Sequence, residues 1–133
     1  MAKIPAALLS NLYEKGSLRN TDTGFELAFR NRMAPITVQS VGPLIVDGRT
    51  FERDVMVVRL ERPAKKFGKQ AEPLLRTGKD FKDGKSLLFD LNCTLRVSVT
   101  ADRLPAGSQR VSCMIQTREM GDMVVQAEDG VDG

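Results

Sequence analysis

Apolar and polar residues alternate along much of this chain, which is the pattern of β-strands that bury one face. The clearest run lies between Leu87 and Ala101, where every second residue is apolar. At about 3.3 Å per residue this run would span about 50 Å, so we expect a bulge or bend near Asp90 to divide it. Shorter alternating or β-branched stretches cover residues 25–30, 36–46, 55–60, 111–118 and 123–128.

Turn-forming residues separate these stretches. Asn20 to Gly24 is rich in turn formers, and Asp47-Gly48 is a strong hairpin signal. About seven or eight strands at such spacing favour an all-β fold over an α/β fold. We predict a two-layer antiparallel β-sandwich, jelly-roll-like, with one short N-terminal helix over residues 4–13 that begins near Pro5 and stops before Gly16.

The size and composition agree with a single domain over residues 1–133. The chain is 41% hydrophobic and 28% charged, and roughly two-thirds of its surface can be buried at this length. The apolar stretch near the N-terminus is short for a signal peptide, and no stretch reaches the roughly 20 apolar residues of a membrane helix. We therefore expect a cytoplasmic protein that does not enter a membrane.

Two segments depart from the strand pattern. Residues 61–85 contain several Pro and Gly residues, and from Arg59 to Lys85 nine Lys or Arg stand against four Asp or Glu. We predict a long basic loop there, because a segment of this composition has no periodic apolar face. Five acidic and no basic residues follow Arg118, and residues 129–133 are predicted to be an acidic, frayed tail.

The residues that usually carry chemistry are scarce. The chain has no His, which excludes Ser-His and Cys-His nucleophile pairs, and its two cysteines, Cys93 and Cys113, cannot build a zinc site alone. We interpret both thiols as buried small hydrophobes. Carboxylates such as Asp80 and Asp83 are interpreted as solvated charges. No catalytic residue, metal ligand or cofactor is assigned.

The basic loop has two interpretations that involve a partner. Its lysines could neutralise phosphates while Phe67 and Phe81 stack on bases. A total of 5% aromatic residues and the lack of Trp argue against nucleic acid. We expect instead that the loop binds a protein partner. Its apolar residues have no evident place in a sandwich core and would contact the partner, and its lysines would form the rim of the interface. The predicted partner-binding residues are Phe67, Leu74, Leu75, Phe81, Lys65 and Lys66.

Several turn motifs resemble a known family. They are Gly16-Ser17-Leu18-Arg19-Asn20, then Gly24-Phe25, Asp47-Gly48 and Leu104-Pro105-Ala106-Gly107. In this order they resemble the small β subunit of bacterial C-glycoside deglycosidases (the C-deglycosylation enzyme β subunit family). The resemblance implies a β-sandwich that supports a larger barrel-type α subunit. That subunit would hold a divalent metal and cleave the C–C bond of 3-oxo C-glycosides.

On this resemblance the chain is a non-catalytic accessory subunit of a lyase complex, with the metal in its partner. The alternative is a stand-alone homo-oligomeric β-sandwich that binds an unknown ligand. Its exposed strand edges and methionines would favour self-association.

Overall fold

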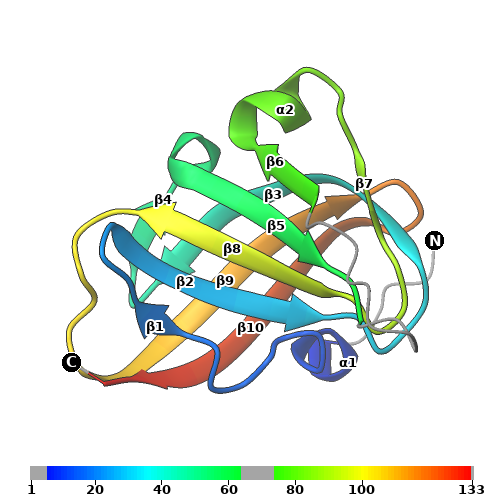
Figure 1. The fold of residues 1–133 in the computed structure, drawn as a ribbon. Helices are drawn as coiled ribbons and strands as arrows, with labels where there is room; N and C mark the ends of the chain where they lie inside the picture. The colour runs from blue at the N-terminus through cyan, green and yellow to red at the C-terminus, as the bar shows by residue number, and fades with distance from the viewer. Residues whose placement is uncertain (1–5, 64–73, 133) are drawn as a thin grey trace.

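The chain folds into two antiparallel sheets packed face to face. The computed structural model describes residues 6–63 and 74–132, and Figure 1 shows β2, β8 and β5 in one layer with β3, β9 and β10 in the other. The prediction of an all-β sandwich with a short N-terminal helix is confirmed. That helix, α1, covers Ala6–Ser10.

The first layer, here called the β2–β8 sheet, has the strand order β1-β2-β8-β5-β6. Its neighbouring strands pair antiparallel, and Phe25, Leu27 and Phe29 lie opposite Val99, Val97 and Leu95. These six side chains are buried, because alternate residues of each strand face the other layer. The strands are β1 (Arg19–Asn20), β2 (Gly24–Arg30), β5 (Met56–Glu61), β6 (Leu74–Thr77) and β8 (Thr94–Thr100).

The second layer, here called the β3–β9 sheet, has the order β10-β9-β3-β4, and β7 pairs with β3 beside this path. Phe51 from this layer meets Phe25 of the other edge to face, with ring centroids 5.0 Å apart. Such contacts across the layers form one continuous core. The strands are β3 (Ile36–Val46), β4 (Arg49–Phe51), β7 (Leu87–Phe89), β9 (Gly107–Thr117) and β10 (Gly121–Val131).

The long alternating run of residues 87–101 is divided between the two sheets. A break near Asp90 was predicted, but as a bulge or bend. In the structure β7 belongs to the β3–β9 sheet and β8 to the β2–β8 sheet, so the chain crosses the sandwich there. The buried Asn31 side chain holds this crossing. Its amide donates to the carbonyls of Phe89 and Ala34 at 2.8 and 2.6 Å, and its oxygen accepts from the Met33 and Ala34 amides.

The prediction of a loop over residues 61–85 is wrong for its second half. β6 pairs with β5, and the five-residue helix α2 (Gly78–Lys82) follows directly. The sequence carried a signal for this helix in Thr77 and Asp80, three residues apart, which form a capping box. Residues 64–73 lie outside the described part of the chain.

The acidic tail does not fray over residues 129–131. β10 continues to Val131, which pairs with Gly107 at the start of β9. Asp129 is only 5% exposed, because its carboxylate accepts hydrogen bonds from the segment after α1. Within residues 6–63 and 74–132, no helix is long and apolar enough to span a membrane.

The Asp129 carboxylate joins the two ends of the domain. It accepts from the Tyr13 hydroxyl at 2.6 Å, from the Gly16 amide at 3.0 Å and from the Leu18 amide at 3.2 Å. Burial by itself would raise the pKa of Asp129. The hydrogen bonds from Tyr13 and from the Leu18, Gly130 and Gly16 amides outweigh burial and lower that pKa. The folded state therefore favours the ionised carboxylate.

Replacing Asp129 by Asn should destabilise the domain by about 1.5–3 kcal/mol, because an amide group cannot accept from all these donors. Urea unfolding at pH 7 measures the change. Asp132→Asn is the matched control, since Asp132 is exposed one residue beyond the strand. Equal unfolding free energies for the two variants would contradict the assigned role.

Stability should also depend on pH through Asp129. Its pKa is lower in the folded state, so the unfolded chain binds more protons and stability rises with pH. The stabilisation is fully present above the unfolded pKa of about 3.9 and is lost as the pH falls through the folded pKa. Urea midpoints from pH 6 to pH 2.5 should fall less steeply for Asp129→Asn than for the wild type.

Candidate functional site

The structure separates the predicted partner-binding residues. Leu75 is 53% exposed on the outer face of β6, while Leu74 is half-buried against the core. The expectation that Phe81 has no place in the core is wrong, because α2 turns its ring inward and leaves it 7% exposed. Phe67, Lys65 and Lys66 lie outside the described residues. Partner binding by Leu75 stays a prediction.

A cavity of about 720 Å³ lies between α2 and the outer side of the β3–β9 sheet. Its lining residues include Phe81, Arg53, Ser40, Gln39 and Gln116. Gln39 and Ser40 come from β3, Gln116 from β9 and Arg53 from the 3₁₀ turn η1 (Arg53–Val55). Four separate elements therefore supply its walls.

Hydrogen bonds at the start of α2 fix the helix over this cavity. The Thr77 amide donates to the Asp80 carboxylate at 2.9 Å, and the Asp80 amide donates to the Thr77 hydroxyl at 3.1 Å. The bond from the Thr77 backbone is the main cause that lowers the pKa of Asp80. At the other end the Gly84 amide donates to the Phe81 carbonyl at 3.0 Å. Both ends of the helix thus hold Phe81 in place.

Arg53 is the best positioned charged group of the cavity. Its Nε donates to the Ser40 hydroxyl at 2.8 Å. Two glycines let the chain approach it: a Cβ at Gly78 would lie 2.5 Å from the Arg53 carbonyl oxygen, and one at Gly42 would lie 3.0 Å from its Cγ. In the described part of the chain, no hydrogen bond or ion pair involves its two terminal nitrogens. These nitrogens remain available for a ligand.

The charges around the cavity favour an acid. Its lining includes three basic residues, Arg53, Lys79 and Lys82, and two acidic residues, Asp54 and Asp83. A guanidinium presents a planar pair of donors that matches a carboxylate. With Phe81 and the side chains of two glutamines among the lining residues, this arrangement suits a small anionic ligand.

The thiol nearest to this site is not reactive in the folded state. Burial raises the pKa of Cys113 to about 12, and its side chain is fully covered. Burial also raises the pKa of Cys93. Among residues 6–63 and 74–132, no three His, Cys, Asp or Glu side chains gather as metal ligands.

No sequence pattern predicts that Arg53, Ser40, Gln39 and Gln116 form a group. Ser40 reaches Arg53 because β3 shifts register against β9 twice, between Val38 and Ser40 and between Val41 and Leu44. Such bulges depend on the partner strand. Period-two alternation within one strand therefore cannot reveal them.

Gly78→Ala tests how tightly α2 packs on Arg53. Gly to Ala in an exposed helix normally stabilises by about 0.5–1 kcal/mol. Here we expect a loss of about 1–3 kcal/mol, because the new methyl group would overlap the Arg53 carbonyl. Urea unfolding measures the sign, with Lys79→Ala on the exposed side of the same helix as control. A stabilised Gly78→Ala variant would show that α2 is not packed this way.

Comparison with known proteins gives the family. The sequence matches the model of the hydroxymethylglutaryl-CoA reductase N-terminal domain over residues 8–132. A search of curated proteins found no match.

This match overturns the resemblance to the C-glycoside deglycosidase β subunit, and with it the accessory role in a lyase complex. The motifs behind that resemblance are turn chemistry that any antiparallel sandwich needs: Asp47 and Gly48 adopt positive φ in a hairpin, and Gly24 packs against the Val99 carbonyl. No finding supports the alternative of a homo-oligomeric module. The match spans nearly the whole sequence, and the chain belongs to the family of hydroxymethylglutaryl-CoA reductase N-terminal domains.

Proposed function

We propose that this chain is a ligand-binding domain that holds a hydroxymethylglutaryl group in the cavity under α2, with Arg53 as the residue that binds its carboxylate. The main support for the proposal is the position of the Arg53 guanidinium. Ser40 holds its Nε, while both terminal nitrogens have no partner in the described residues. The family name supplies the ligand.

The chemistry of this acyl group matches the cavity. A hydroxymethylglutaryl thioester keeps one free carboxylate and also carries a hydroxyl and a methyl group. The carboxylate suits the guanidinium, the hydroxyl suits the amides of Gln39 and Gln116, and the methyl group suits the Phe81 ring. The cavity of about 720 Å³ is larger than this acyl group, which leaves room for the thioester arm.

The exposed lysines of α2 support the same ligand. Lys79 and Lys82 lie at the cavity and add positive charge near Arg53. The lining residues carry three basic and two acidic groups, and an excess of positive charge raises the local concentration of an anionic ligand. The proposal assigns binding to this chain and assigns it no bond-breaking step and no cofactor. It places the protein in the cytoplasm, which the unpaired thiols of Cys93 and Cys113 support.

Replacing Arg53 by Gln should weaken binding of 3-hydroxy-3-methylglutarate by about 10- to 100-fold, because a charge-assisted hydrogen-bonded contact contributes about 1.5–3 kcal/mol. Isothermal titration calorimetry on the full chain measures the affinity. Arg103→Gln is the matched control, since Arg103 is exposed and lies outside the cavity. It should bind as the wild type does.

Two further ligands sharpen the experiment. The uncharged dimethyl ester of the same acid should not bind, because it lacks the carboxylate. Coenzyme A without an acyl group should bind more weakly than hydroxymethylglutaryl-CoA. If Arg53→Gln and wild type bind the acid equally, or if coenzyme A alone binds as tightly as the thioester, the proposed acyl recognition is wrong.

A further inference from the structure

A second hollow lies on the other sheet, on the outer face of the β2–β8 sheet. Its volume is about 390 Å³, and it is bounded by the segment after α1 and by β1, β2 and β8. Four basic residues line it: Lys15, Arg19, Arg30 and Arg96. We name this hollow the arginine groove.

The strand register explains why these residues surround one place. Ala28 of β2 lies opposite Arg96 of β8, and Arg30 lies opposite Thr94. Arg19 of β1 lies opposite Glu26. Ala28 is the smallest outward side chain of this group, and the long side chains around it leave it 1% exposed. The result is a hollow with Ala28 at its floor and arginines at its walls.

The acidic residues around the groove are already paired. Glu26 is bound by Arg19 and lies 4.0 Å from Arg96, which also binds Glu61 at 3.0 Å. Glu14 is paired with Arg32 at 3.0 Å. In the described part of the chain, neither Arg30 nor Lys15 makes a side-chain hydrogen bond or ion pair. The groove therefore keeps positive charge that the protein does not neutralise.

The outer face beyond the groove is also rich in arginine. Arg59 lies directly opposite Arg96 across β5 and β8, and both share Glu61. The Arg59 Nε is buried without a hydrogen-bond partner. Like charges placed opposite each other on a sheet are unfavourable, and an anion near them lowers this cost.

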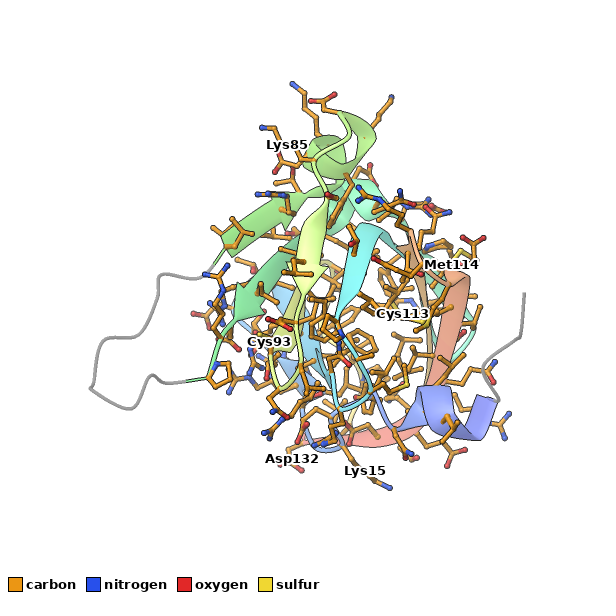
Figure 2. The ribbon with its side chains drawn as sticks, turned by 90° about the vertical axis from the view of Figure 1, so that its right-hand side faces the viewer. Lys15, Lys85, Cys93, Cys113, Met114 and Asp132 are labelled. Atoms are coloured by element: carbon orange, nitrogen blue, oxygen red, sulfur yellow. The ribbon has the colours of Figure 1, made fainter. Side chains whose placement is uncertain are left out.

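We propose that the arginine groove binds a small phosphate-bearing anion. Phosphate carries more acceptor oxygens than a carboxylate, so it can accept from guanidinium groups on several sides at once. The size of the groove suits a phosphate or diphosphate group. This site is separate from the cavity under α2: Figure 2 shows Lys15, which lines the groove, and Lys85, just after α2, at opposite ends of the molecule. The proposal stands apart from the proposed function.

Filling the groove tests the proposal without changing any charge. Ala28→Leu should weaken binding of inorganic pyrophosphate at least 10-fold, because the larger side chain occupies the floor. Ser98→Leu is the matched control, since Ser98 is exposed on the same outer face and does not line the groove. Calorimetric titration measures both, and thermal unfolding of each variant shows whether it is folded.

Arg30→Gln gives a second measurement if Ala28→Leu does not fold. Removing an unpaired cation should weaken pyrophosphate binding about 10-fold and reduce its dependence on salt between 50 and 200 mM. Arg53→Gln should bind pyrophosphate as the wild type does, which distinguishes this site from the cavity under α2. Inorganic phosphate and vesicles of anionic phospholipid then show whether the phosphate is taken free or from a lipid headgroup.

Three results would overturn the proposal. One is equal pyrophosphate affinity for Ala28→Leu and Ser98→Leu. Another is unchanged affinity for Arg30→Gln. The third is binding of a poly-glutamate peptide more tightly than pyrophosphate, which would indicate a surface for acidic proteins in place of a phosphate site.

Discussion

The buried Asp129 carboxylate is the constraint on which the arrangement of both ends of this domain depends. It sits in the last strand and accepts from the Tyr13 hydroxyl and from the Gly16 and Leu18 amides. A charge in such a position is costly unless hydrogen bonds replace its water. Tyr13 in turn packs edge to face on Phe29, with ring centroids 5.9 Å apart. One carboxylate thus ties the N-terminal segment to β10 of one sheet and, through Tyr13, to β2 of the other.

This tie also sets the geometry of the arginine groove. Lys15 comes directly before Gly16, and Arg19 comes directly after Leu18. The Asp129 carboxylate accepts hydrogen bonds from the Gly16 and Leu18 amides. The Ser17 hydroxyl adds a bond from the Ala28 amide at 2.9 Å, which fixes the same segment beside the groove floor. Because the backbone of this segment is held by a group from the opposite sheet, the positions from which Lys15 and Arg19 extend are fixed relative to β2 and β8. A local feature of the surface therefore rests on a buried interaction.

The sequence predicted the parts of the fold that depend on one strand at a time. The alternation between Leu87 and Ala101 is visible without knowing its partners, because each buried residue there faces the core. Asp129 was missed because an acidic residue beside Gly130 near the end of a chain is more often solvated, and its donors lie more than a hundred residues away. Arg53 was missed for a similar reason. Its role depends on the bulges of β3 and on Gly78, which only the folded chain brings together.

The two candidate sites follow from the same property of a sandwich. The inner faces of its sheets form the core, so polar side chains can gather only on the outer faces and at the ends. On the β3–β9 sheet, α2 lies beside part of the outer face and forms an open cavity with Phe81 among its lining residues. On the β2–β8 sheet the hollow beside Ala28 is bounded by the segment after α1 and by long basic side chains. The first arrangement suits a ligand with an apolar body, and the second suits a compact anion that remains partly in water. The difference in chemistry between the sites therefore follows from which sheet carries the helix.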